Sequence, residues 1–170
     1  MTTLKTIVSV KLTFNCSLER AFKTPILGDA TQFLVGYGII PAVVKFTKDD
    51  TWGKVGGQRV PHGAKNLLSK GGEIGLDEIY NRDENVYWKW GISNFYQWSM
   101  GFTEFQGELF FIETKKKTIK VHWKYTLFSK SKLAYPLHWL FGNIFWKKQM
   151  KIGIQKMKDY AESNAKFLYK

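Results

Sequence analysis

Apolar and polar residues alternate along much of the chain, and a period of two is typical of half-buried β-strands. In segment 7–14, every second residue from Val8 to Phe14 is apolar, and the residues between them are polar. This alternation at 7–14, 86–95 and 118–128, together with turn-forming sequences between the segments, predicts seven strands, at 7–14, 42–47, 57–65, 72–80, 86–95, 102–113 and 118–128. Turn-forming sequences such as Lys48-Asp49-Asp50 separate these segments, so we expect an antiparallel sheet.

Two short helices are expected after the first strand. Ser17 can cap a helix that starts at residue 18, and we expect Pro25 to end it. A second short helix is expected at 30–35, between the glycines that flank this segment.

The period becomes helical after Pro136, and this is the longest helix that the sequence predicts. Its apolar stripe consists of Trp146, Met150, Gly153, Ile154, Met157, Ala161, Ala165 and Leu168. Such a helix is suited to cover the open face of a curved sheet. We therefore expect a single α+β domain over residues 1–170, in which a curved seven-stranded antiparallel sheet wraps around a long C-terminal helix.

The composition narrows the possible partners. Hydrophobic residues make up 44% of the chain, and the net charge is +12, but arginine occurs only at positions 20, 59 and 82. Because recognition of nucleic acid usually draws on arginine, we expect no nucleic-acid partner. The single cysteine, Cys16, cannot form an internal disulfide, and the first residues lack the pattern of a signal peptide. We therefore expect a cytoplasmic protein.

A glycine-rich stretch at 51–63, TWGKVGGQRVPHG, has two interpretations. A phosphate-binding P-loop needs glycine, four residues, and then Gly-Lys followed by Ser or Thr. Here Val55 follows Gly53-Lys54, and Lys48 stands where the first glycine is required. A strand is expected next rather than a helix, so no helix N-terminus faces a phosphate. We interpret the stretch as a turn between two strands.

The order of elements resembles the helix-grip fold of the START and Bet v 1-like superfamily, including polyketide cyclase/dehydrase-like proteins. The resemblance covers essentially the whole chain, and the stretches that carry it are 52–59 (WGKVGGQR), Glu78-Ile79, Val121-His122-Trp123 and 153–162 (GIQKMKDYAE). It implies a cavity between the sheet and the C-terminal helix that holds a hydrophobic or amphipathic small molecule. Catalytic positions vary among such proteins, so the resemblance assigns none here.

The candidate lining of this cavity combines residues of the sheet with residues of the helix. The expected ligand-binding residues are Ile74, Leu76, Trp88, Trp90, Leu109, Trp123, Tyr125, Met150, Ile154 and Met157. Each can equally be an ordinary core residue. The three histidines, at positions 62, 122 and 138, are widely spaced, so we expect neither a metal nor a cofactor.

One carboxylate is a candidate acid–base group. Glu78 alternates onto the same predicted face as Ile74 and Tyr80, and a carboxylate on an apolar face has a raised pKa or an ion-pair partner. The structural alternative to catalysis is an ion pair with Arg59 on the neighbouring strand.

The segment 133–146 is apolar nearly all round and is followed by Lys147-Lys148. It can pack under the sheet, lie on an anionic membrane surface, or form a homodimer contact, and we favour the first. Our main hypothesis is that the protein, a monomer or homodimer, binds a hydrophobic or amphipathic molecule such as a lipid, polyketide or aromatic metabolite. The alternatives are a cyclase- or dehydratase-type enzyme that uses the same cavity, and a module that docks on a protein or membrane.

Overall fold

The computed structural model describes residues 4–48, 50–96 and 100–163. In that part of the chain, eight strands form one antiparallel sheet in the order β1-β8-β7-β6-β5-β3-β2, and β4 pairs only with β3. The strands are β1 (Leu4–Phe14), β2 (Val43–Lys48), β3 (Gln58–Gly63), β4 (Gly72–Glu73), β5 (Leu76–Asp83), β6 (Tyr87–Ser93), β7 (Phe102–Lys115) and β8 (Thr118–Ser129). The predicted sheet is confirmed, with the segment at 72–80 divided between β4 and β5.

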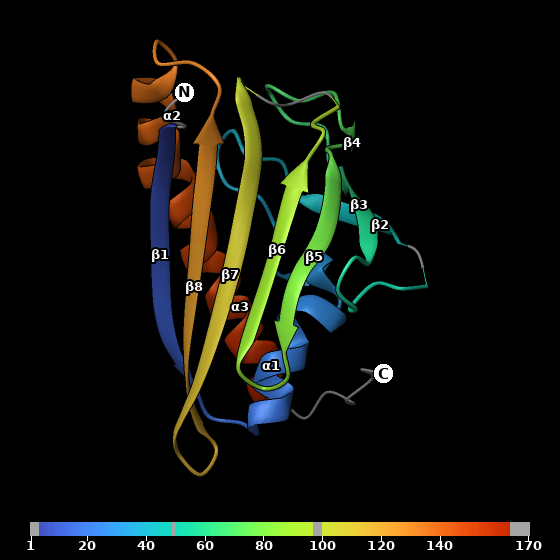
Figure 1. The fold of residues 1–170 in the computed structure, drawn as a ribbon, viewed down its shortest axis with the longest axis vertical. Helices are drawn as coiled ribbons and strands as arrows, with labels where there is room; N and C mark the ends of the chain where they lie inside the picture. Colours follow the sequence, from blue (N-terminus) through green and yellow to red (C-terminus); the bar gives the residue numbers. More distant parts are fainter. Residues whose placement is uncertain (1–3, 49, 97–99, 164–170) are drawn as a thin grey trace.

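One long helix covers the concave face of the sheet. It starts as α2 (Tyr135–Phe141), passes through a π-helical segment (Gly142–Trp146), and continues as α3 (Lys147–Glu162), 28 residues in all. Figure 1 shows α3 running behind the long strands β1, β8 and β7. The predicted helix-grip arrangement is therefore confirmed.

The first helix, α1 (Leu18–Leu27), is longer than predicted. Ser17 caps it as expected and accepts a hydrogen bond from Arg20 N, but Pro25 lies inside the helix instead of ending it. Pro25 removes one backbone donor, and its ring is buried in the interior. The second predicted helix is only a 3₁₀ turn, Ala30–Gln32.

The glycine-rich stretch at 51–63 is a turn that leads into β3, as predicted. Gly53 and Gly56 adopt positive φ values of 98° and 80°, which favour glycine. The indole of Trp52 donates a hydrogen bond to Ile26 O at 2.9 Å and so ties the turn to α1.

The hydrophobic core fills the space between the concave face of the sheet and the helices α1 and α3. Its largest fully buried side chains include Trp88, Trp123, Phe22 and Phe105. No helix in the described part of the chain combines the length and the apolar character that a membrane crossing requires.

Candidate functional site

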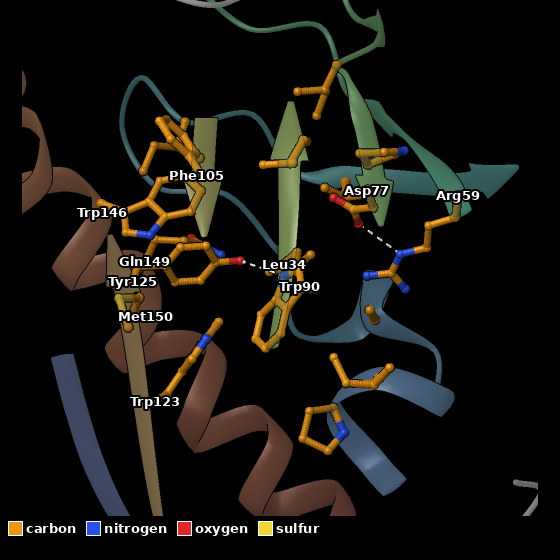
Figure 2. Close-up of a pocket in the computed structure, with 18 of the residues that line it drawn as sticks. Leu34, Arg59, Asp77, Trp90, Phe105, Trp123, Tyr125, Trp146, Gln149 and Met150 are labelled. Carbon is orange, nitrogen blue, oxygen red and sulfur yellow. Dashed lines mark hydrogen bonds and ion pairs between the residues drawn. The ribbon is translucent and has the colours of Figure 1, made fainter. Parts of the chain in front are cut away.

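An interior cavity of about 90 Å³ lies between the sheet, α1 and α3. Its walls are largely apolar and include five large aromatic side chains of the sheet and the long helix, Trp90, Phe105, Trp123, Tyr125 and Trp146 (Figure 2). The cavity is smaller than the 300–1,000 Å³ that is usual for drug-sized ligands. Large side chains therefore occupy most of the space that the curved sheet encloses.

The structure brings most of the predicted lining residues together. Those that border the cavity are Ile74, Trp90, Leu109, Trp123, Tyr125, Met150 and Met157. The other three predicted lining residues lie elsewhere, each for a physical reason.

Trp88 is fully buried, but α1 covers it. Its ring stacks on Phe22 with a centroid distance of 4.8 Å, and its indole donates to Phe22 O at 2.9 Å. Ile154 is buried in the core without bordering the cavity. Leu76 is only half-buried, on the outer face of β5.

The prediction that Glu78 shares the apolar inner face is wrong. In β5 the buried residues are Asp77 and Ile79, whereas Glu78 and Tyr80 are half-buried on the outer face. Glu78 accepts a hydrogen bond from Gln58 Nε2 at 2.9 Å instead of pairing with Arg59. The Tyr80 ring packs over Gly91 on that outer face, and its hydroxyl donates to Glu104 Oε1. Tyr80 therefore does not line the cavity.

The charged residues of the cavity are Arg59 of β3 and Asp77 of β5. The two residues are paired across neighbouring strands, and Arg59 Nε donates to Asp77 Oδ2 at 2.9 Å. Burial raises the pKa of the Asp77 carboxyl, and the adjacent guanidinium opposes this shift. Burial also lowers the pKa of Arg59, but a guanidinium stays protonated at neutral pH.

The guanidinium of Arg59 lies between two aromatic rings and uses few of its donors. Its central carbon is 3.9 Å from the ring centroids of both Phe46 and Trp52. Within the described residues, its two terminal nitrogens donate to no acceptor. Arg59 also borders a surface groove formed with Gly28, Lys45 and other residues, so it separates the cavity from the outside.

Further polar groups face the cavity from the other side, as Figure 2 shows for Tyr125 and Gln149. The Tyr125 hydroxyl accepts from Trp90 Nε1 at 3.2 Å. Burial, followed by the charge of Asp77, raises the pKa of Tyr125. In the described part of the chain, Trp123 Nε1, Trp146 Nε1 and Gln149 Oε1 are buried without any hydrogen-bond partner. An unmet polar group inside an apolar cavity is costly unless something else satisfies it.

Sequence reasoning missed Asp77 and Gln149. Gln149 lies three residues after Trp146 and four before Gly153, so the helical period places it on the inward stripe. Asp77 gave no such signal, because a charged residue between apolar neighbours predicts the solvent face. Among the described residues, no group of three or more His, Cys, Asp or Glu side chains is arranged to hold a metal ion.

The comparisons with known proteins concern the fold. No family model and no curated protein sequence matches the chain. Among solved structures, norcoclaurine synthase from Thalictrum flavum is similar with a TM-score of 0.70 and 10% identity, over 95% of this chain and 96% of that chain. Ara h 8.0201 is similar with a TM-score of 0.68 and 16% identity, over 95% of this chain and 100% of that chain.

The di-domain ARO/CYC protein StfQ, from the steffimycin biosynthetic pathway, is similar with a TM-score of 0.70 and 11% identity. This match covers 94% of the present chain and 51% of StfQ. The protein thus has the helix-grip fold of the Bet v 1-like (SRPBCC) proteins. At these identities, the similarity defines the fold and leaves the ligand open.

Proposed function

We propose that the protein binds a small amphipathic molecule in the cavity between the sheet and α3. The apolar part of the ligand lies among the aromatic rings, and its acidic group, a carboxylate, binds the guanidinium of Arg59. The observation that carries this proposal is the set of buried polar groups around an apolar cavity that have no partner among the described residues. Apolar burial contributes about 25 cal/mol per Å² and supplies affinity, while the few polar groups orient the ligand.

The volume of the cavity limits the ligand. An apolar cavity of about 150 Å³ can hold a benzene ring, whereas this cavity measures about 90 Å³. A slender chain fits most readily, and a ring requires the wall to adjust. Met150 and Met157 line that wall, and methionine side chains adapt readily to an irregular ligand.

The polar end of the ligand is inferred from Arg59. A guanidinium has five N–H donors in a planar fork that matches a carboxylate, and only Nε is used by Asp77. A second carboxylate beside Asp77 would favour protonation of one of the two. The raised pKa of Asp77 makes this protonation easier. The expected ligand class is therefore small organic acids with an apolar body.

One solved structure of similar fold supports the binding of small molecules with an apolar body. A structure of norcoclaurine synthase from Thalictrum flavum, 13% identical to this chain with a TM-score of 0.66, is a complex with dopamine and hydroxybenzaldehyde. It matches over 96% of this chain and 91% of that chain.

The indole N–H groups offer a direct test by NMR. The protein is titrated with hexanoate and benzoate, and separately with their uncharged amides. We expect the acids to shift the signals of Trp90, Trp123 and Trp146, which border the cavity, and to leave Trp88 and Trp139 unchanged. Arg59→Met should remove the preference for acid over amide. Equal shifts of all the indoles, or no shift at any concentration, would contradict the proposal.

The second candidate is a cyclase- or dehydratase-type enzyme, and one observation favours it. Asp77 Oδ1 accepts no hydrogen bond from the described residues, and the Tyr125 hydroxyl borders the same cavity. This pair would take the acid–base role first considered for Glu78. Native mass spectrometry of the purified protein identifies a co-purified molecule. An enzyme should convert that molecule on incubation and lose the conversion in Asp77→Asn, whereas a binding protein should return it unchanged.

A further inference from the structure

An exposed set of apolar side chains lies on the outer face of α2, of the turn before it and of the π-helical segment after it. Leu133, Leu137, Leu140 and Ile144 are 93%, 65%, 43% and 50% exposed, and Trp139 beside them is 52% exposed. The four aliphatic residues are spaced by four, three and four positions, so they follow one side of the helix. These five residues are called the apolar ridge below.

The opposite face of α2 is held firmly against the body of the protein. His138 is buried, and its ring nitrogens lie 2.6 Å from Ser129 Oγ and 2.7 Å from Met100 O. The ring also stacks on Phe102 with a centroid distance of 3.9 Å. The apolar ridge is therefore the outer side of an anchored helix and is not exposed by loose packing.

Lysines border the apolar ridge at both ends. Lys130 and Lys132 precede it, and Lys147, Lys148 and Lys151 follow it. No aspartate or glutamate occurs anywhere from residue 130 to residue 158. An apolar helix face with a flanking tryptophan and basic ends is typical of helices that lie in the interface of an anionic membrane.

We propose that the apolar ridge docks the protein on the surface of a membrane that contains anionic lipids. A second copy of the chain fits this surface less well. In a two-fold dimer the same patch faces itself, so lysines of one copy would meet lysines of the other. An anionic bilayer instead provides an apolar layer for the ridge and negative charge for the lysines on either side.

The position of the apolar ridge relates it to the cavity. Ile144 of the ridge is two residues from Trp146, which lines the cavity, and the Trp146 ring packs 6.0 Å from that of Phe141. A docked protein would hold its cavity wall close to the bilayer, where apolar acids accumulate. This last consequence depends on the proposed ligand binding, whereas the docking itself does not.

The test is co-sedimentation of the full chain with vesicles of phosphatidylcholine alone or with added phosphatidylglycerol. We expect partitioning to be at least about tenfold stronger on the anionic vesicles and to weaken in high salt. Two double variants, Leu137→Ser/Leu140→Ser and Lys147→Glu/Lys148→Glu, should each lower it by about tenfold or more. Circular dichroism melting establishes that they fold.

Matched controls separate docking from general charge attraction. Lys115→Glu/Lys116→Glu changes the same charge in the β7–β8 hairpin, at the opposite end of the molecule from α2 (Figure 1). Val86→Ser/Ile112→Ser removes two exposed apolar side chains, one from the β5–β6 turn and one from β7. Both controls should keep most of the binding to anionic vesicles.

Equal losses of binding in Lys147→Glu/Lys148→Glu and Lys115→Glu/Lys116→Glu, or no binding to anionic vesicles, would overturn the proposal. A dimer in sedimentation velocity that disappears in Leu137→Ser/Leu140→Ser, without vesicle binding, would overturn it in favour of a second copy.

Discussion

Arg59 Nε donates to Asp77 Oδ2 across 2.9 Å, and each residue is only 6% exposed. The free energy that a buried ion pair gains from Coulomb attraction is usually offset in large part by desolvation, because both charges lose their hydration. Removing one partner is more harmful, because it leaves a buried charge without compensation. The pair therefore ties β3 to β5 while keeping two charged groups beside an apolar cavity.

A double-mutant cycle should reveal this coupling. We expect Arg59→Met and Asp77→Leu each to lower the free energy of unfolding by about 3–5 kcal/mol. The double variant should lose less than the sum of the two, because it buries no isolated charge. Urea unfolding measures all four proteins. Glu78→Leu, on the outer face of β5, is the control and should cost much less. Additive losses would mean that the two residues act independently.

Two fully buried leucines provide a matched test of the cavity. Leu109 borders it, whereas Leu127 packs in the core under Gly142. Leu→Ala at either site should cost about 2–5 kcal/mol in unfolding free energy. Only Leu109→Ala enlarges the cavity, so we expect it to bind benzoate about tenfold more tightly than the wild type does. Isothermal titration calorimetry compares the three proteins. A similar gain in Leu127→Ala would show that loosened packing, and not the cavity, admits the ligand.

The fold could be predicted from the sequence, because the strands at 7–14 and 118–128 alternate strongly and the last helix has one clear apolar stripe. Figure 1 shows these elements side by side, with α3 against the strands β1 and β8. Their periodicity reflects burial of one face, which is a local property that a single chain displays directly.

The site was harder to predict, because the hydrophobic pattern assigns charged residues to the solvent. Around Asp77 this rule predicts the wrong face of β5 to be buried, because the charged Asp77 faces the interior. Arg59 compensates the buried carboxylate, and the apolar Leu76 and Tyr80 turn outward. Such compensation depends on a residue 18 positions away and on the pairing of β3 with β5. Trp88 and Trp90 show a related limit, because alternation places both inside but does not reveal that Trp88 packs against Phe22 of α1 while Trp90 borders the cavity.

Gly107 fixes the position of Trp90. The two residues are paired between β6 and β7, and a Cβ atom on Gly107 would overlap the Trp90 ring. We expect Gly107→Ala to lower the free energy of unfolding by about 1–3 kcal/mol and to displace the indole from Tyr125. The Trp90 indole N–H signal reports this displacement.

Gly91→Ala is the matched control for that experiment. A Cβ atom at Gly91 would overlap Tyr80, but on the outer face of the sheet. It should destabilise the protein while leaving the Trp90 signal in place. If Gly107→Ala also leaves that signal unchanged, the glycine does not position the cavity wall.

His122 should make the protein less stable in mild acid. Burial lowers its pKa from the ordinary value of 6.5, and the charges of Lys11 and Lys124 lower it further, while Glu108 opposes them. Nε2 of this ring has no hydrogen-bond partner among the described residues. Because the folded pKa is lower than the unfolded one, the unfolded chain binds more protons as the pH falls from 6.5 toward the folded value. Stability should therefore fall across that window, and His122→Gln should lack this part of the decline.

Urea unfolding between about pH 7.5 and about pH 5 compares the two proteins, and NMR titration of the His122 ring measures the pKa itself. A ring pKa at or above 6.5 in the folded protein would rule out this origin of acid sensitivity.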